Sequence, residues 1–230
     1  MPLSIVATPI GNLGDLSPRS AEALTSADLW LVEDTRVSGK LQGHLGIKKQ
    51  MKVLNEHTSP SKLNEYVELL TAGSNVALLT DGGTPVVSDP GTQLVDACMD
   101  LGIPVDAIPG PSAPINALAL SGFFGQRFAF LGFLGRKPGA IKEELGVFAD
   151  SPLTLVLFES PHRFNKVLEL AGEVLGSRRY TICREMTKVH QQIWRRRLPE
   201  LPTIEEIPSK GEFTIVIEGK RRRELADNQM

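Results

Sequence analysis

Short apolar runs alternate with helical patterns through the first half of the chain. Few polar residues interrupt these runs, as strands covered on both faces of a sheet require, and Pro or Gly separates them from the helical stretches. The alternation predicts βα units and a mostly parallel five-stranded sheet with helices on both faces. The expected strands cover residues 3–7, 29–32, 52–54, 76–79 and 105–108.

Three of the expected helices begin with a polar residue followed by proline. The pairs are Ser17-Pro18, Ser59-Pro60 and Asp89-Pro90. The first member is a good N-cap acceptor, and proline suits the first helical position because its missing N–H has no intrahelical partner there. The clearest pattern is the third connecting helix, where apolar residues follow helical spacing and a glycine stands where a C-cap is needed. These positions are Leu63, Tyr66, Val67, Leu70 and Gly73.

The second half begins after a segment rich in Gly and aromatic residues, residues 122–135. The expected domains are an N-terminal α/β domain over 1–118, a C-terminal α/β domain over 119–220 and a charged tail over 221–230. A strong helix is expected over 161–175, ended by Gly176. Adjacent strands near the end of the chain, with no helix between them, predict a mixed sheet. The expected strands cover residues 128–131, 153–158, 180–183, 191–195 and 213–217.

The composition predicts a soluble protein without a targeting segment. The 230 residues are 41% hydrophobic and carry a formal net charge of -2, so nucleic-acid binding would need a local basic surface. Cys98 and Cys183 have no metal-ligand spacing and predict neither a zinc site nor a disulfide framework. With no signal peptide and no membrane-length apolar run, we expect a cytoplasmic protein without a membrane partner.

Unusual residues cluster directly after the expected strands. In parallel α/β sheets ligands bind outside the carboxyl ends of the strands, so this edge is the expected functional site. Any one such loop is equally well explained by turn and capping chemistry, but seven loops together favour a site. The loop segments span residues 8–12, 33–36, 55–57, 80–85, 109–113, 159–163 and 184–188.

The loop over residues 81–85, Asp-Gly-Gly-Thr-Pro, suggests the kind of ligand. It combines an acceptor side chain with glycines that let backbone approach a ligand, and it lacks the lysine that a triphosphate needs. No P-loop motif is present. A weakly charged nucleoside such as S-adenosylmethionine fits this chemistry. The histidines lack metal-site spacing and no G-x-S-x-G elbow occurs, so the sequence favours neither a metalloenzyme nor an acyl-transfer hydrolase.

The loops together resemble the ribosomal RNA small-subunit methyltransferase I family. The motifs that carry the resemblance are T-P-I-G-N, E-D-T-R, D-G-G-T-P and E-S-P-H-R, which begin at Thr8, Glu33, Asp81 and Glu159. The resemblance to this family extends from about Leu3 to Gly219. The family shares the tetrapyrrole-methylase-like two-domain fold of class III S-adenosylmethionine-dependent methyltransferases. It implies methyl transfer to a cytidine ribose 2′-hydroxyl in 16S ribosomal RNA, with the small ribosomal subunit as partner, and a homodimer.

The resemblance also implies a cofactor cleft between the two domains. The cofactor-binding residues carried over from the family motifs are Pro9, Gly11, Asp81, Gly83, Thr84, Val86, Ser112, Ala113, Phe158 and Thr214. Prolines such as Pro9 are equally well explained by backbone shaping alone.

Methyl transfer to a ribose hydroxyl depends on in-line positioning and gains from a nearby base. The candidates are Glu33, Asp34, Glu159 and Lys210, which the sequence does not rank, and Glu33 and Asp34 are equally consistent with capping or pairing with Arg36. Guanidinium and ammonium groups suit phosphate contacts, and the RNA-binding candidates are Arg36, Arg163, Arg184 and Lys188. The run Arg195 to Arg197 adds basic residues where the family usually has a tight-turn glycine.

Two other functions are compatible with these residues. One is a methylase of a tetrapyrrole or another small molecule, with the same fold and cofactor. The other is a non-catalytic regulator that binds a nucleoside or RNA.

Overall fold

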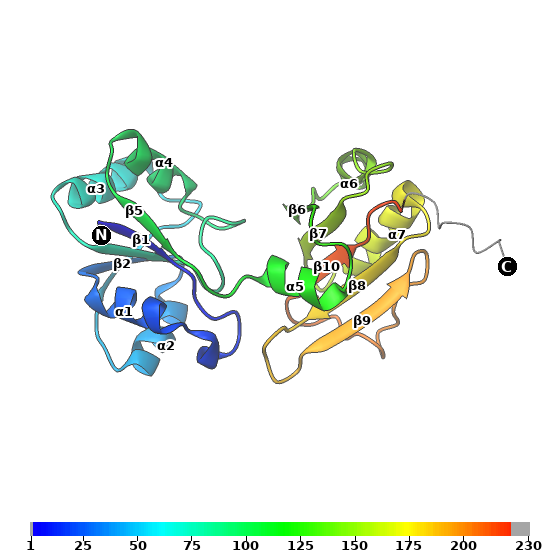
Figure 1. Ribbon diagram of the computed structural model, residues 1–230, viewed down its shortest axis with the longest axis horizontal. Coiled ribbons are helices and arrows are strands. Elements are labelled where there is room, and N and C mark those ends of the chain that lie inside the picture. The colour runs from blue at the N-terminus through cyan, green and yellow to red at the C-terminus, as the bar shows by residue number, and fades with distance from the viewer. Residues whose placement is uncertain (1, 222–230) are drawn as a thin grey trace. The chain divides into compact units, whose positions relative to one another are not determined.

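The computed structural model describes residues 2–221, so nearly all of the expected charged tail lies outside the described residues. The chain divides into two compact units, Met1–Ser112 and Ala113–Met230 (Figure 1). The division falls before the boundary expected at 118. The physical reason is that the helix at the start of the second unit, α5 (Ala113–Ser121), packs against three strands of that unit.

The first unit is a five-stranded parallel sheet in the order β3-β2-β4-β1-β5, which confirms the expected α/β class. The expected strand positions are confirmed, with ends that differ by up to two residues. The elements are β1 (Leu3–Val6), the short helix η1 (Leu13–Asp15), α1 (Pro18–Ser26), β2 (Leu29–Val32), α2 (Thr35–Leu45), β3 (Gln50–Val53), α3 (Pro60–Thr71), β4 (Val76–Leu79), α4 (Thr92–Asp100) and β5 (Val105–Ile108).

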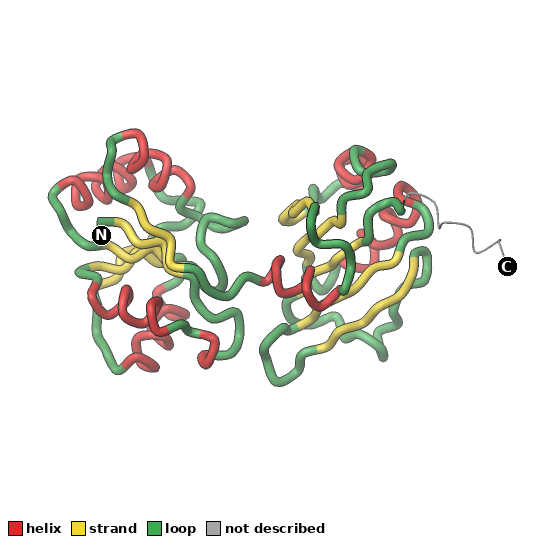
Figure 2. The backbone as a smooth tube through the Cα atoms, in the orientation of Figure 1, coloured by secondary structure: helices red, strands yellow, loops and turns green. Residues whose placement is uncertain are grey.

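Helices cover both faces of this sheet (Figure 2). Alternate residues of a strand point to opposite faces of the sheet. Because both faces are covered, a run such as residues 29–32 is buried throughout. Leu31 and Leu78 pack with residues of α3 and α4, whereas Trp30 and Leu79 pack with residues of α1 and α2. Two apolar layers thereby fix the sheet and bring the carboxyl ends of its strands to one edge.

Two of the three expected proline-marked caps are confirmed. The Ser17 and Ser59 hydroxyls accept hydrogen bonds from the first turns of α1 and α3. The third was wrong, because α4 begins at Thr92 after Gly91, which has φ +123°, and Asp89 does not cap it. Gly91 can adopt this positive φ because it has no side chain, so the chain turns after Asp89 and the helix starts later.

The second unit contains the expected mixed sheet, in the order β6-β7-β10-β8-β9. Only β6 and β7 pair in parallel. α6 and α7 provide core residues on one face, and α5 packs against β7, β8 and β10 on the other. The elements after α5 are β6 (Phe128–Phe133), α6 (Pro138–Gly146), β7 (Thr154–Glu159), α7 (Phe164–Leu175), β8 (Arg179–Arg184), β9 (Gln192–Arg197) and β10 (Phe213–Ile217).

Candidate functional site

The loops after β1, β4 and β5 are joined by direct hydrogen bonds. The Thr8 N–H donates to the Gly83 carbonyl (2.9 Å), and the Gly83 N–H donates to the Thr8 carbonyl (3.0 Å). The Thr84 hydroxyl donates to the Pro111 carbonyl (3.1 Å). The structure thus brings together three of the loops in which sequence motifs predicted a cofactor site.

Glycine is required where these loops meet. A Cβ added to Gly82 would lie 3.1 Å from the Pro9 carbonyl oxygen, and one added to Gly110 would lie 3.0 Å from the Ala7 Cβ. Gly83 has φ +93°, a conformation that L side chains rarely adopt. Close backbone approach, rather than side-chain chemistry, therefore shapes this edge of the sheet.

Strained backbone continues along the loop after β4. Val86 has φ +75° and Ser88 has φ +61°, although neither is glycine. A β-branched residue in the left-handed region is unusual, and such strain is concentrated at binding and active sites. Val86 is one of the predicted cofactor-binding residues, and this conformation distinguishes it from an ordinary loop valine.

A group of carboxylates lies at the ends of β2 and β4. Burial raises the pKa of Glu33, and the nearby charges of Asp81 and Asp89 raise it further, against a hydrogen bond from the Asp81 backbone. Burial and the charge of Asp34 likewise raise the pKa of Asp81. The group is therefore an electronegative site in which protonation is easier than in water.

Asp34 is held in a different way from Glu33. Its carboxylate caps α2 by accepting from the Arg36 backbone N–H (2.8 Å), and it also accepts from the Arg36 guanidinium (2.6 Å). These bonds lower the pKa of Asp34 to about 2. The capping and pairing interpretation thus describes Asp34 and Arg36, whereas it does not describe Glu33.

Asp89 belongs to this group, which the sequence reasoning missed by assigning it to a helix cap. Burial raises the pKa of Asp89, while the hydrogen bond from the Thr80 hydroxyl (2.9 Å) acts in the opposite direction. The Pro-Gly pair that follows it was the available signal, because that pair favours a turn over a helix start.

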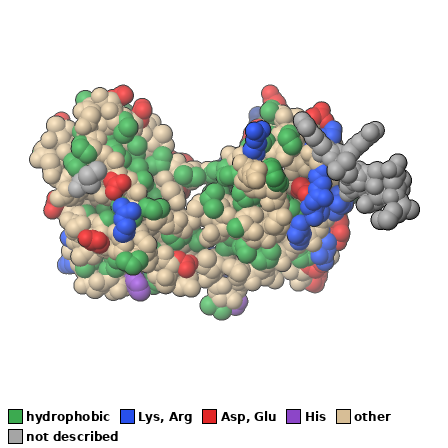
Figure 3. Space-filling model, in the orientation of Figure 1, with side chains coloured by type: hydrophobic (Ala, Val, Ile, Leu, Met, Phe, Trp, Pro, Cys, Tyr) green, Lys and Arg blue, Asp and Glu red, His purple; other side chains and the backbone are tan. Residues whose placement is uncertain are grey.

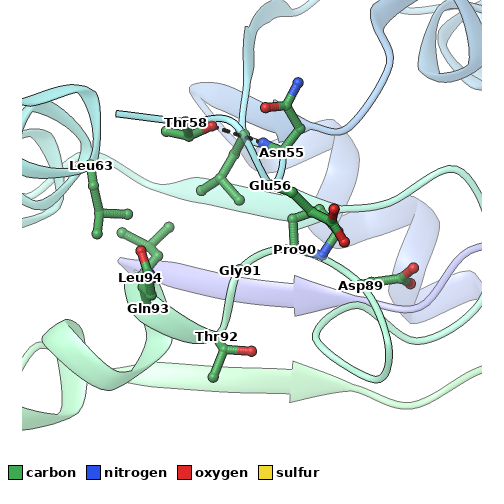
Figure 4. Close-up of a pocket in the computed structure, with 11 residues that line it drawn as sticks. Asn55, Glu56, Thr58, Leu63, Asp89, Pro90, Gly91, Thr92, Gln93 and Leu94 are labelled. Atoms are coloured by element: carbon green, nitrogen blue, oxygen red, sulfur yellow. Dashed lines mark hydrogen bonds between the residues drawn. The ribbon is translucent and has the colours of Figure 1, made fainter. Parts of the chain in front are cut away.

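A small pocket borders the carboxylates. Its volume is about 180 Å³, and its lining includes the carboxylates Glu56 and Asp89 and the apolar side chains Leu63 and Leu94 (Figure 4). The Asn55 N–H donates to the Thr58 hydroxyl (2.9 Å), which fixes the loop after β3. The pocket lining combines carboxylate acceptors with apolar side chains, which suits a small group bearing hydrogen-bond donors.

In the second unit, Glu159 at the end of β7 is fully buried and pairs with Arg163. The distance from Arg163 Nη2 to Glu159 Oε2 is 3.3 Å, and the Ser160 N–H donates to Oε1 (2.7 Å). Arg163 also donates to the Leu134 and Gly135 carbonyls (3.1 and 2.8 Å). The residues of the E-S-P-H-R segment thus bind one another and the loop after β6.

Arg184 and Lys188, both predicted to contact RNA, are engaged with internal partners. Arg184 is buried and donates to the Lys210 carbonyl (2.5 Å) and to the Gln192 side chain (3.0 Å). Lys188 pairs with Glu185 (3.1 Å) and Glu212 (3.0 Å). Lys210 is exposed and meets Arg184 through its backbone.

The cofactor-binding candidates fall into two groups, one in each unit. Within the second unit, Phe158 and Thr214 are paired across β7 and β10, two of the strands on which α5 packs. Phe158 also contacts the rings of Phe130 and Phe133, with centroid distances of 5.0 and 5.5 Å. The structure therefore brings these two candidates together.

Over residues 2–221, no group of His, Cys, Asp or Glu side chains has the arrangement of a metal site. Within the same residues, no helix has the length and apolar character needed to span a membrane.

Comparison with known proteins identifies the family. The family described as Tetrapyrrole (Corrin/Porphyrin) Methylases matches residues 2–202. A Haemophilus influenzae protein named Ribosomal RNA small subunit methyltransferase I is 44% identical over 98% of this chain and 81% of its own length. A Thermotoga maritima protein of the same name is 42% identical over 95% of this chain and 98% of its own. The chain belongs to the ribosomal RNA small subunit methyltransferase I family. The resemblance predicted from the loop motifs is thereby confirmed.

Solved structures place this family member in the tetrapyrrole methylase fold. The methyltransferase CobJ superimposes with a TM-score of 0.70 at 17% identity, covering 97% of this chain and 96% of its own. A uroporphyrin-III-C-methyltransferase from Thermus thermophilus gives a TM-score of 0.64 at 21% identity, covering 93% of each chain. At these identities the likeness concerns the fold, which agrees with the predicted class.

Proposed function

We propose that this methyltransferase family member transfers a methyl group from S-adenosylmethionine to the ribose 2′-hydroxyl of a cytidine in 16S ribosomal RNA. The observation that carries the proposal is the identity above 40% to relatives named for small-subunit ribosomal RNA, over nearly the whole chain. The two structural neighbours, CobJ and the uroporphyrin-III-C-methyltransferase, share about half of that identity or less.

The chemistry of the first unit fits S-adenosylmethionine. That cofactor carries a sulfonium and an ammonium against one carboxylate, so its net positive charge is attracted by Glu33, Asp81 and Asp89. Loops held by the Thr8–Gly83 pairing present backbone close to a ligand. When bound, the cofactor supplies an electrophilic methyl group. Within the first unit, we assign its binding to the predicted residues around Gly83.

Glu33 is the strongest candidate for the general base. Its raised pKa brings it closer to neutral pH, where a carboxylate is both ionised and able to accept a proton. Asp34 is a weak base because Arg36 holds its pKa at about 2. Glu159 is buried against Arg163 and Ser160, which suits it to hold the loop after β6. In the proposed reaction Glu33 accepts the hydroxyl proton as the ribose oxygen attacks.

Among the four predicted RNA contacts, Arg36 remains the best suited. Its side chain is 89% exposed, and Asp34 orients it at the start of α2. Arg163, Arg184 and Lys188 are much less exposed than Arg36 and donate to internal partners, so we assign them to positioning the loops of the second unit.

A homodimer in the cytoplasm completes the proposal. The second unit has several exposed apolar side chains that are candidates for contact with a second copy, among them Ile115, Leu120 and Phe133. Sedimentation of the wild type and of Phe133→Asp tests this part, because a monomeric wild type contradicts it.

The acceptor is tested by incubating the protein with methyl-labelled S-adenosylmethionine and either unmethylated small ribosomal subunits or precorrin. Label at a cytidine 2′-oxygen of the 16S RNA is expected, and label only in the tetrapyrrole overturns the proposal. Calorimetry with S-adenosylmethionine and its demethylated product tests whether the protein is a methyltransferase or a non-catalytic regulator. If neither compound binds, the methyltransferase proposal is wrong.

A further inference from the structure

The second unit carries a cluster of arginines around an aromatic ring. The Phe123 ring lies under two guanidiniums, with the Arg195 Cζ at 4.6 Å and the Arg179 Cζ at 5.2 Å from its centroid. Arg179 comes from β8, Arg195 from β9 and Phe123 from the segment after α5. Three parts of the chain thus build one cationic surface.

Strand register places a third arginine on the same face. Arg179 pairs with Arg197, and Thr181 pairs with Arg195, across β8 and β9. Residues directly opposite each other share a face, as do residues two apart on one strand. Arg195 and Arg197 therefore project on the Phe123 side of the sheet, whereas Arg196 projects on the other side, over the Trp194 ring.

The charges of this surface are only partly compensated. Glu218 accepts from both Arg179 (2.7 Å) and Arg221 (2.7 Å), so one carboxylate serves two guanidiniums. Within residues 2–221, Arg195 and Arg197 have no carboxylate within ion-pair distance. The Arg197 guanidinium donates to the Ser177 carbonyl (3.3 Å). In a chain of net charge -2, these two arginines are a local positive excess.

An open cavity of about 390 Å³ adjoins the Phe123 ring, and its lining includes Phe123, Phe124, Arg179, Glu218 and Arg221. The Phe124 side chain is 58% exposed, and its carbonyl is fixed by the Thr154 hydroxyl (2.7 Å). Figure 3 shows Lys and Arg side chains gathered at this end of the second unit. The cavity therefore combines an exposed ring on an anchored backbone with nearby guanidiniums.

We infer that this surface binds a single-stranded segment of the RNA substrate. Arg195 and Arg197 hold backbone phosphates, and Phe124 provides a platform on which a base stacks. Guanidiniums suit phosphates because their donors match two phosphate oxygens at once. An exposed aromatic ring on the same side of the second unit as two arginines that have no carboxylate partner within residues 2–221 favours RNA over an acidic peptide, which offers no base to stack. The inference rests on the proposed RNA substrate and adds a binding surface to it.

The surface is tested with a fluorescein-labelled single-stranded RNA oligonucleotide of 16S sequence, by anisotropy at several salt concentrations. The double variant Arg195→Ala/Arg197→Ala is expected to bind about 10-fold or more weakly, and its salt slope to fall by about 1.4 because each phosphate contact on a single strand contributes roughly 0.7. Phe124→Ala is expected to bind about 5-fold to 100-fold more weakly, with little change in the slope.

Arg196→Ala is the matched control, because Arg196 lies on the same strand, faces the opposite side and pairs with Glu200. It should bind RNA nearly as the wild type does. Equal losses in Arg196→Ala and in the double variant overturn the inference, as does unchanged binding in the double variant. Competition by polyglutamate without any RNA binding points to a protein partner and also overturns it.

Two further readouts separate this inference from the proposed function. Calorimetry with S-adenosylmethionine should give wild-type affinity in every variant, which shows that each is folded. If the wild type does not methylate small subunits but the variants still differ in RNA affinity as expected, the proposed reaction is wrong and the RNA-binding surface is supported. If the double variant methylates subunits with an unchanged KM, the surface fails and the reaction stands.

Discussion

Thr8 and Gly83 exchange both of their backbone hydrogen bonds, at 2.9 and 3.0 Å, although β1 and β4 lie far apart in sequence. This pairing locks two loops of the candidate site together. It depends on the backbone of Gly83, whose φ of +93° is adopted with little strain only by glycine.

Gly83→Ala is therefore expected to weaken both the fold and cofactor binding. A side chain at this φ costs about 1 to 3 kcal/mol, and its Cβ would lie 3.4 Å from the Ile10 side chain. Urea unfolding measures the first effect and calorimetry with S-adenosylmethionine the second.

Gly73→Ala is the matched control for that variant. Gly73 has φ +90° at the end of α3, and no atom lies within 4 Å of the added Cβ. It should lose similar stability while keeping wild-type cofactor affinity. If both variants bind the cofactor normally, the loop after β4 is not part of the cofactor site.

Asp81→Asn is expected to weaken binding of S-adenosylmethionine by about 5-fold to 100-fold, because it removes a charge that attracts the positive cofactor. The loss should shrink as salt rises. Asp96→Asn, an exposed position on α4, is the control and should bind normally. Unchanged affinity in Asp81→Asn would count against the site.

Glu33→Gln tests the general base. It keeps the size of the side chain but cannot accept the proton, so kcat should fall about 100-fold to 10,000-fold with a small change in cofactor affinity. In the wild type, kcat should rise as pH increases through the raised pKa of Glu33, since the ionised form is the base. That rise should be absent in the variant.

Asp34→Asn is the comparison for this profile. The Asp34 pKa of about 2 lies below the working range, and asparagine is an equally good N-cap, so the pH dependence should be retained. A pH profile that is identical in the wild type and in Glu33→Gln would remove Glu33 from the mechanism.

The order and type of the elements could be predicted because apolar periodicity follows burial directly. Residues 29–32 and 76–79 are buried on both faces, and their uninterrupted apolar character gave both strand ends correctly. The predicted range of the edge strand β3, residues 52–54, was displaced from the observed Gln50–Val53. The residues of this strand are more exposed than those of the central strands, so their hydrophobic pattern is weaker.

Contacts distant in sequence could not be predicted in this way. The motifs put Arg163 and Arg184 at strand ends, but only the fold shows that their guanidiniums bind carbonyls of other loops. The arginine surface depends on β8–β9 register, which separates Arg195 and Arg197 from Arg196. The composition gives the charge of these side chains, but it does not say which groups they contact in the fold.

Asp89→Asn should stabilise the protein at neutral pH. Burial and the charge of Asp81 raise the Asp89 pKa in the folded state, so its contribution is fully present below the unfolded pKa and is lost as pH rises through the folded pKa. Asparagine removes the charge and still accepts from the Thr80 hydroxyl. The gain in unfolding free energy should be present at pH 7 and absent near pH 3, with Asp96→Asn showing neither effect.

Arg163→Ala tests whether this residue holds the second unit together or contacts RNA. Its loss leaves the buried Glu159 carboxylate without its paired positive charge and the Leu134 and Gly135 carbonyls without their donor, which should cost about 2 to 4 kcal/mol in urea unfolding. Lys166→Ala, which removes an exposed pair with Glu169, should cost under about 1 kcal/mol. Adding Glu159→Gln should restore part of the stability, because the unpaired charge is then gone. A stable Arg163→Ala that binds RNA weakly would instead return this arginine to the RNA interface.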